Sequence, residues 1–294
     1  MKRLKSQDHA GYFYLLPAAV LMGVFIIYSM VLNVQISLTD WSGLSEKHFI
    51  GLKNYIQLFH DKAFWDSLGV QMIWMLLSTV FLALGGLVLS IIVEYFIHRK
   101  LQAVFRTMFF MPMMMSLVAV GILWTLIYNP LIGVINEILQ ILGLLSGNQT
   151  LDLLGNHNTA LLAAFIPALW QWSGFGMVVF SAALQGMPKE LLEAASLDGC
   201  SKWQQIRHII LPLLRPTIIT VCTINLIGGM KCFDLLYTMT KGGPGTATQS
   251  TTIYIYKEMF TNSHYGYSAA MSMILFIVTV FVSMLFLRMT KNKN

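Results

Sequence analysis

The side chains that could do chemistry in this chain are a few polar residues set into strongly apolar stretches. Lys231 and Asp234 are charged and close together at the end of one such stretch, and Asn225 lies deeper within it. A charge in lipid is costly to place and therefore marks a candidate functional site. Counted at about 1.5 Å per residue from Leu213, Lys231 lies roughly 27 Å along a helix, near one edge of a bilayer core about 30 Å thick. We therefore predict a local ion pair between Lys231 and Asp234 at an outer gate, rather than a binding charge at the bilayer centre.

Several motifs of known chemistry are missing from the sequence. There is no GxxxxGK[ST] loop, so any ATP that is used must bind to another subunit. There is also no HExxH motif, no cluster of cysteine and histidine, and no pair of intramembrane carboxylates suited to acid and base work. Cys200, Cys222 and Cys232 have no ligand-type spacing, and we interpret them as small core residues without disulfides. An enzyme is therefore a poor interpretation, and we expect no cofactor in this chain.

Composition indicates a membrane protein. Charged residues make up 11% and hydrophobic residues 56% of the 294 residues, whereas soluble domains contain roughly 25% charged residues. Runs of about 20 mainly apolar residues can cross a bilayer as helices. A membrane barrel needs strands that alternate polar and apolar residues, and runs such as 81–89 do not alternate. We predict six transmembrane helices, within residues 11–39, 67–93, 107–136, 153–188, 216–230 and 259–287.

The distribution of lysine and arginine predicts the orientation of these helices. Basic residues are concentrated in segments that fall on one side, and fewer lie on the other side, at 47–62 and 241–257. Cytoplasmic loops carry the excess of Lys and Arg, so both termini are predicted to be cytoplasmic. The net charge of +6 follows from this bias and from attraction to anionic lipid headgroups, and it needs no nucleic acid. The basic segments on the cytoplasmic side are 2–5, 99–106, 189–215 and 288–293.

A polar segment, residues 187–212, separates the fourth and fifth predicted spans. Residues 189–197 have the spacing of an amphipathic helix, and Gly199 supplies the left-handed residue that commonly ends one. Ser201 and Gln204 have the spacing of a capping box, which begins a second helix. Pro212 is expected to start a new backbone segment. Spacing alone is equally compatible with an ordinary helical hairpin at the membrane surface and with a docking element.

Motifs in and beyond this segment resemble one family. Glu193-Ala194-Ala195, followed by Asp198-Gly199 and Leu211-Pro212, is similar to the EAA loop of the membrane subunits of bacterial ABC importers. Further motifs resemble the carbohydrate-uptake branch, of the maltose-transporter type, although Lys241 stands where that family often has glycine. These motifs are residues 233–237, 240–244, 254–256 and 265–270.

The resemblance implies a complete architecture. The chain would be an all-α integral membrane permease of the cell membrane, a single domain over 1–294 with six transmembrane helices and both termini cytoplasmic. Its EAA coupling loop, 187–212, would dock onto a separate ATPase subunit that binds ATP and Mg. The implied partners are a second related permease, two ATPase subunits, an extracytoplasmic substrate-binding protein and a carbohydrate. The outer loops would be 40–66, 129–158 and 238–264.

A sugar site should combine a few hydrogen-bonding side chains with aromatic platforms. We prefer Asn225 as the substrate contact, although a hydrogen bond from a buried Asn to a neighbouring helix is an equally ordinary interpretation. Gly228 and Gly229, which follow Asn225 in the fifth predicted span, either permit close packing between helices or loosen the helix. The predicted pathway residues are Trp170, Trp172, Asn225, Gly228, Gly229, Lys231, Asp234 and Tyr237.

Two alternatives stay open at this point. A permease for another solute, such as glycerol phosphate, would share every feature described so far. A secondary transporter would need a site for a coupling ion, for which Asp234 is the candidate.

Overall fold

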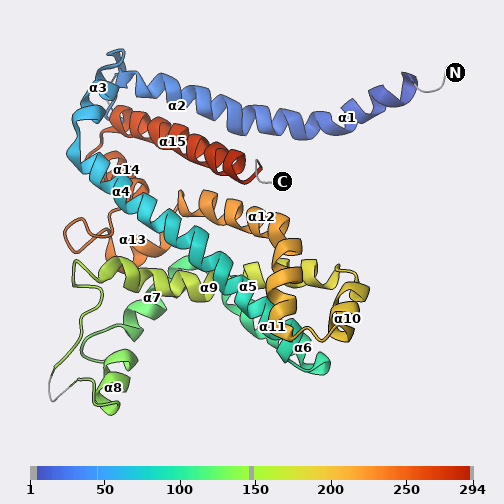
Figure 1. The fold of residues 1–294 in the computed structure, drawn as a ribbon. Coiled ribbons are helices and arrows are strands. Elements are labelled where there is room, and N and C mark those ends of the chain that lie inside the picture. Colours follow the sequence, from blue (N-terminus) through green and yellow to red (C-terminus); the bar gives the residue numbers. More distant parts are fainter. Residues whose placement is uncertain (1–4, 45, 146–148, 292–294) are drawn as a thin grey trace. The chain divides into compact units, whose positions relative to one another are not determined.

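A computed structural model describes residues 5–44, 46–145 and 149–291, and they are largely helical (Figure 1). The chain groups into two compact units, which are described separately: Met1–Phe64 with Ile255–Ile277, and Trp65–Tyr254 with Val278–Asn294. The basic residues at 2, 3 and 293 that entered the prediction of orientation lie outside the described residues, as do residues 146–148 of the predicted outer loop.

The first unit contains a long amino-terminal helical run and a folded segment after it. Asn54 fixes the join between the two, because its buried amide donates to the carbonyls of Ser37 (2.9 Å) and Thr39 (3.0 Å). Two short strands pair antiparallel with Thr39 opposite Phe49. The segment 40–66, expected as an outer loop, contains the short helix α3, which buries Leu58. The elements are α1 (Lys5–Met22), η1 (Gly23–Tyr28), α2 (Ser29–Ser37), β1 (Thr39–Asp40), β2 (His48–Phe49), α3 (Lys53–His60) and η6 (Lys257–Thr261).

The second unit is built from long helices joined by short ones. The π-helical turn η2 joins α4 to α5 and η5 joins α11 to α12, whereas η3 ends the run that begins with α4. Such turns are frequent at functional sites. The elements are α4 (Lys62–Leu77), η2 (Ser78–Leu82), α5 (Ala83–Ile91), η3 (Ile92–Phe96), α6 (Arg99–Phe110), η4 (Met111–Met114), α7 (Leu117–Ile127), α8 (Val134–Ile141), α9 (Ala160–Gln185), α10 (Lys189–Leu197), α11 (Lys202–Gln205), η5 (Ile206–Ile210), α12 (Leu211–Gly229) and α13 (Asp234–Thr240). Three helices extend across the boundary between the units: α4, α14 (Thr251–Tyr256) and α15 (Tyr265–Lys291).

Five helices in the described part of the chain are long and apolar enough to cross a membrane, and six if one bent pair is a single span. The pattern therefore agrees with the expectation of a multi-span helical protein. The fifth predicted span is longer than expected, because it begins at Lys202 rather than at residue 216. The straight candidates are Tyr14–Ser37, Lys62–Phe96, Ala160–Gln185, Lys202–Gly229 and Tyr265–Thr290.

Pro212 does not begin a new segment, contrary to the prediction. The π-helical turn η5 directly precedes α12, and Pro212 lies in the first turn of that helix. Local π-helical adjustments re-satisfy backbone groups that a proline leaves free. The helical run therefore continues from α11 through Pro212 to Gly229.

The third predicted span, 107–136, is broken. Arg99–Met114 and Leu117–Ile127 meet at 95°. The chain passes through a 3₁₀ turn that contains Pro112, and Met115 is extended. Gln171 on α9 donates its amide to the carbonyl of Met115 at 2.8 Å, so this exposed backbone acceptor is satisfied inside the protein. A run of apolar residues alone gave no sign of this bend.

Glycine lets α5 and α9 touch through their backbones. A Cβ atom added to Gly86 would lie 2.6 Å from the Cα of Gly176 and 2.8 Å from the backbone nitrogen of Met177. Small residues permit such close approach between membrane helices. The two helices are therefore held in one register at this crossing.

Replacing Gly86 with alanine is expected to destabilise the protein. The added methyl overlaps the α9 backbone, and overpacking of this kind costs about 1–3 kcal/mol. The Tm of the detergent-purified protein should fall by several degrees. Gly69→Ala is the matched control, because nothing lies within 4 Å of a Cβ there and alanine favours a helix by about 1 kcal/mol. Equal Tm values for the two variants would show that the contact is not tight.

Candidate functional site

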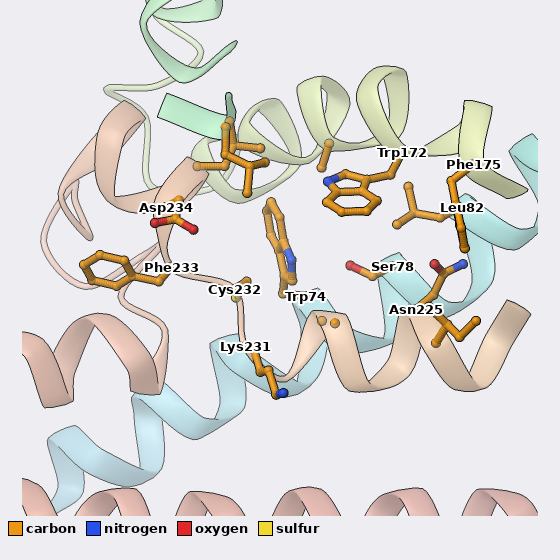
Figure 2. Close-up of a pocket in the computed structure, with 16 residues that line it drawn as sticks. Trp74, Ser78, Leu82, Trp172, Phe175, Asn225, Lys231, Cys232, Phe233 and Asp234 are labelled. Carbon is orange, nitrogen blue, oxygen red and sulfur yellow. The ribbon is translucent and has the colours of Figure 1, made fainter. Parts of the chain in front are cut away.

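A cavity of about 250 Å³ lies between α4, α9, α12 and the linker that follows α12 (Figure 2). Its lining is mainly apolar and aromatic, with a few hydrogen-bonding groups. Six of the predicted pathway residues line it: Trp172, Asn225, Gly228, Gly229, Lys231 and Asp234. The lining also includes Trp74, Ser78, Phe175, Cys232 and Phe233, which were not among the predicted pathway residues.

Two indole rings face two polar groups across this cavity. Figure 2 shows Trp74 and Trp172 entering the space from different helices, with Ser78 and Asn225 beside them. Trp74 is held edge-on against Phe165, with ring centroids 5.5 Å apart. Asn225 is 8% exposed, so its amide is turned into the protein rather than toward lipid. The walls therefore combine aromatic platforms with side chains that can donate and accept hydrogen bonds.

Two predicted residues lie outside the cavity lining. Trp170 is 40% exposed and packs against Trp124, with centroids 6.0 Å apart. Residues two apart on a helix point in nearly opposite directions, so Trp170 and Trp172 cannot both face one cavity. Tyr237 lies on α13, where its ring stacks on Phe233 at 5.0 Å. Tyr237 thus supports a lining residue and does not itself line the cavity.

The predicted Lys231–Asp234 ion pair is not found among the ion pairs of the described residues. The α12 helix ends at Gly229, and Asp234 begins α13. Because the backbone between them is not helical, a spacing of three residues does not bring the side chains together. Figure 2 shows their charged ends on different sides of the linker. Both side chains are exposed at the edge of the cavity.

Buried polar side chains hold this linker in place. The Gln71 amide donates to the carbonyl of Gly229 at 2.7 Å and to the Cys232 sulfur at 3.1 Å. The hydroxyls of Ser250 and Thr252 donate to the carbonyl of Cys232. Gln71 is fully buried. A single amide in an apolar run carries no motif, which is why the sequence did not identify it.

The turn after α13 contains a residue in an uncommon conformation. Lys241 has φ +51°, and Gly242 follows with φ +92°. The left-handed region favours glycine, and Lys241 stands where the resembled family often has one. The turn is tied across by Thr248, whose hydroxyl lies 2.6 Å from that of Thr240.

The segment 187–212 forms a sharp elbow, defined here as residues 189–205. Gly199, at φ +81°, ends α10 as predicted, and the amides of Gly199 and Cys200 donate to the carbonyls of Ser196 and Ala195. This is the paired hydrogen bonding of a Schellman motif. Ser201 and Gln204 form the predicted capping box at the start of α11.

The predicted coupling residues divide by exposure. Glu193, Ala194, Asp198 and Gly199 are exposed, whereas Ala195 is buried. Leu211 and Pro212 lie beyond the elbow, in the first turn of α12. The elbow therefore presents a short exposed helix whose geometry is set by its own hydrogen bonds.

Neither a metal centre nor a disulfide is seen in the described ranges. No group of three or more His, Cys, Asp or Glu side chains there could hold a metal ion. The three cysteines are free, and Cys200 is exposed rather than in a core, because it follows the Gly199 turn. Cys222 and Cys232 are partly buried, in line with the prediction.

Comparison with known proteins gives consistent matches over nearly the whole chain. A family model described as the binding-protein-dependent transport system inner membrane component matches residues 86–292. The probable ABC transporter permease protein YurN of Bacillus subtilis is 36% identical over 281 residues, 95% of each chain. The multiple sugar-binding transport system permease protein MsmF of Streptococcus mutans is 31% identical over 284 residues, 96% of this chain and 95% of the relative.

The fold also resembles a solved structure. This is a chain of the bacterial alginate ABC transporter in complex with alginate pentasaccharide-bound periplasmic protein, with a TM-score of 0.84 and 21% identity. The likeness covers 98% of this chain and 96% of that chain. At this level of identity, it establishes the fold.

Replacing Gln71 with leucine is expected to loosen the cavity linker. The change keeps the side-chain size but leaves the Gly229 carbonyl with only the 3.4 Å bond from the Cys232 backbone nitrogen, and the loss of a hydrogen bond costs about 0.5–1.5 kcal/mol. A lower Tm of the purified protein would report this loss. Gln57→Leu is the control, because Gln57 is exposed on α3 and surface changes usually stay within about 0.5 kcal/mol. A Tm unchanged by Gln71→Leu would contradict the assigned role.

Proposed function

Because the chain belongs to the binding-protein-dependent transport system inner membrane component family, we propose that it is the permease subunit of an ATP-driven sugar importer and forms half of the translocation pathway. Membership makes it a multi-pass protein of the cell membrane and a transport component rather than an enzyme. The observation that carries the sugar assignment is the cavity in which Trp74 and Trp172 face Ser78 and Asn225.

The chemistry of the cavity suits a neutral polyhydroxylated ligand. Sugar rings have apolar faces that pack on indoles, and their hydroxyls need both donors and acceptors, which Ser78 and Asn225 provide. Lys231 and Asp234 bring opposite charges to the edge of the cavity, so no excess of positive charge favours a phosphate ester. The volume of about 250 Å³ is below the roughly 300–1,000 Å³ of complete ligand sites. A second permease subunit would supply the remaining surface.

The names of the related proteins support the proposals that the substrate is a carbohydrate and that an external binding protein delivers it. MsmF is named as a multiple sugar-binding transport system permease, and the alginate transporter was solved with a pentasaccharide-bound periplasmic protein. A secondary transporter is not favoured, because the relatives are ABC transporter components and Asp234 lies exposed at the cavity edge.

The elbow is the proposed docking site for the ATPase. We place both termini and the elbow in the cytoplasm from the distribution of lysine and arginine. The exposed face of α10, with Glu193 and Ala194, would enter a groove on the ATPase subunit, which binds ATP and Mg. Two such subunits, a second permease and an extracytoplasmic binding protein would complete the importer.

Replacing Asn225 with leucine should weaken sugar uptake. Loss of one hydrogen bond to the ligand is expected to raise the KM of uptake about tenfold, equivalent to about 1.4 kcal/mol. Candidate sugars are first screened for binding to the cognate binding protein, and uptake of the bound ones is measured in proteoliposomes. Thr223→Val is the control, since its hydroxyl bonds within α12, to the Ile219 carbonyl. Uptake abolished by an ionophore, without ATP dependence, would contradict the proposed importer.

Replacing Gly199 with a residue that disfavours positive φ should uncouple ATP hydrolysis from transport. Valine at φ +81° is strained by about 1–2 kcal/mol, whereas asparagine tolerates the left-handed region. The stimulation of ATP hydrolysis by the substrate-loaded binding protein should therefore be lost in Gly199→Val and largely retained in Gly199→Asn. Glu193→Lys should also lower this stimulation of ATP hydrolysis, because it reverses a charge on the surface proposed to contact the ATPase. A parental rate in both Gly199→Val and Glu193→Lys would show that the elbow does not receive the ATPase.

A further inference from the structure

Lys202 ties the elbow to the end of the α4–η3 run, and Arg106 ties that end to α6 and α9; the proposed docking requires neither contact. We propose that Lys202 and Arg106 are positioning residues that fasten the elbow, η3, α6 and the end of α9 into one rigid block. This inference rests on the proposed function, because the block would carry motion of the ATPase to the cavity walls.

Hydrogen bonds within the elbow make it rigid. Gln205 is 6% exposed, and its amide donates to the Ser196 hydroxyl at 2.9 Å and to the Cys200 carbonyl at 3.4 Å. This side chain spans the angle between α10 and α11, in addition to the Schellman motif and the capping box. The two short helices are therefore expected to move together.

Lys202 joins the elbow to the end of the α4–η3 run. Its ammonium group donates to the Tyr95 carbonyl at 3.3 Å and lies 5.3 Å from the centre of the Phe96 ring. The acceptor is one of the carbonyls left free at the end of a helix, where a cation is favoured. The first residue of α11 thus caps the last turn of η3.

Arg106 joins the same turn to α6 and α9. Its guanidinium donates twice to Glu94 Oε1, from Nη2 at 2.7 Å and from Nε at 3.1 Å. With its amide oxygen facing the guanidinium, Gln185 accepts from Nη1 at 3.1 Å. The Glu94 side chain is only 10% exposed, so the ion pair is screened less by water than a surface pair.

Apolar packing also joins the elbow to these helices, because Leu192 packs in one hydrophobic cluster with Leu184 and Tyr95. An open hollow of about 700 Å³ lies among Tyr95, Arg106, Gln185 and Leu192. Side chains therefore do not fill the space between α10 and α6, so the polar contacts add to the apolar packing in transmitting a displacement of the elbow.

The block is connected to the three walls of the cavity that long helices form. The α4–η3 run carries Trp74 and Ser78, and α9 carries Trp172. The third wall, with Asn225, belongs to α12, which continues directly from α11. A displacement of α10 would therefore reach all three walls together, rather than through α12 alone.

Distances between spin labels test the proposal. Cys200, Cys222 and Cys232 are first changed to serine, and labels are attached at Leu197 on α10 and Val104 on α6, both exposed. Pulsed electron paramagnetic resonance is measured on the assembled importer in nanodiscs, without nucleotide and after trapping with ATP and vanadate. The parent should give one narrow distribution with the same maximum in both states. Arg106→Met and Lys202→Met should each broaden or shift it.

Control variants distinguish the loss of the Arg106 and Lys202 contacts from a general loss of folding. Arg99→Met removes a neighbouring exposed cation that lines the same hollow and should leave the parental distribution. The exchange Glu94→Arg with Arg106→Glu should restore much of the narrow distribution, which a loss of folding would not allow. A maximum that moves between the two states in the parent, or a parental distribution in both Arg106→Met and Lys202→Met, would overturn the proposal. The distributions without nucleotide report on the ties even if the elbow does not receive the ATPase, so the two proposals can fail separately.

Discussion

The structure depends on one constraint, which is that lipid offers no partner for a free backbone group. Each interruption of a membrane helix must therefore be satisfied by the protein itself. Two interruptions occur beside the cavity, one after Met114 and one after Gly229. At each of them a glutamine from a neighbouring long helix donates to a freed carbonyl, Gln171 to Met115 and Gln71 to Gly229. The unbroken helices thus make the broken ones possible.

The broken segments are also what gives the cavity its character. The cavity is lined at one side by Leu117, directly after the first break, and at another by the residues from Lys231 to Leu235, after the second. Backbone that is not helical can bring residues close in sequence to different sides of a space, as Lys231 and Asp234 do. A bundle of unbroken helices would place such residues on a common face.

The sequence predicted the class of protein and the elbow well, because both have local causes. Composition and apolar runs depend on residue type alone, and Gly199, Ser201 and Gln204 fix their turns through neighbours in the chain. The bend at 95° and the non-helical linker that separates Lys231 from Asp234 were missed, because tertiary contacts such as those of Gln171 and Gln71 stabilise them. Trp74 and Ser78 were missed for a similar reason, since nothing in an apolar helix says which face meets a cavity.

The local encoding of the elbow has an evolutionary consequence. Its angle is set by residues 195–205, and none of them lines the cavity. If the cavity selects the solute and the elbow receives the ATPase, as proposed, substitutions around Trp74 and Trp172 would alter solute preference without disturbing the docking surface. One ATPase could therefore serve several permeases of different selectivity, provided that each keeps the same short stretch of turn chemistry.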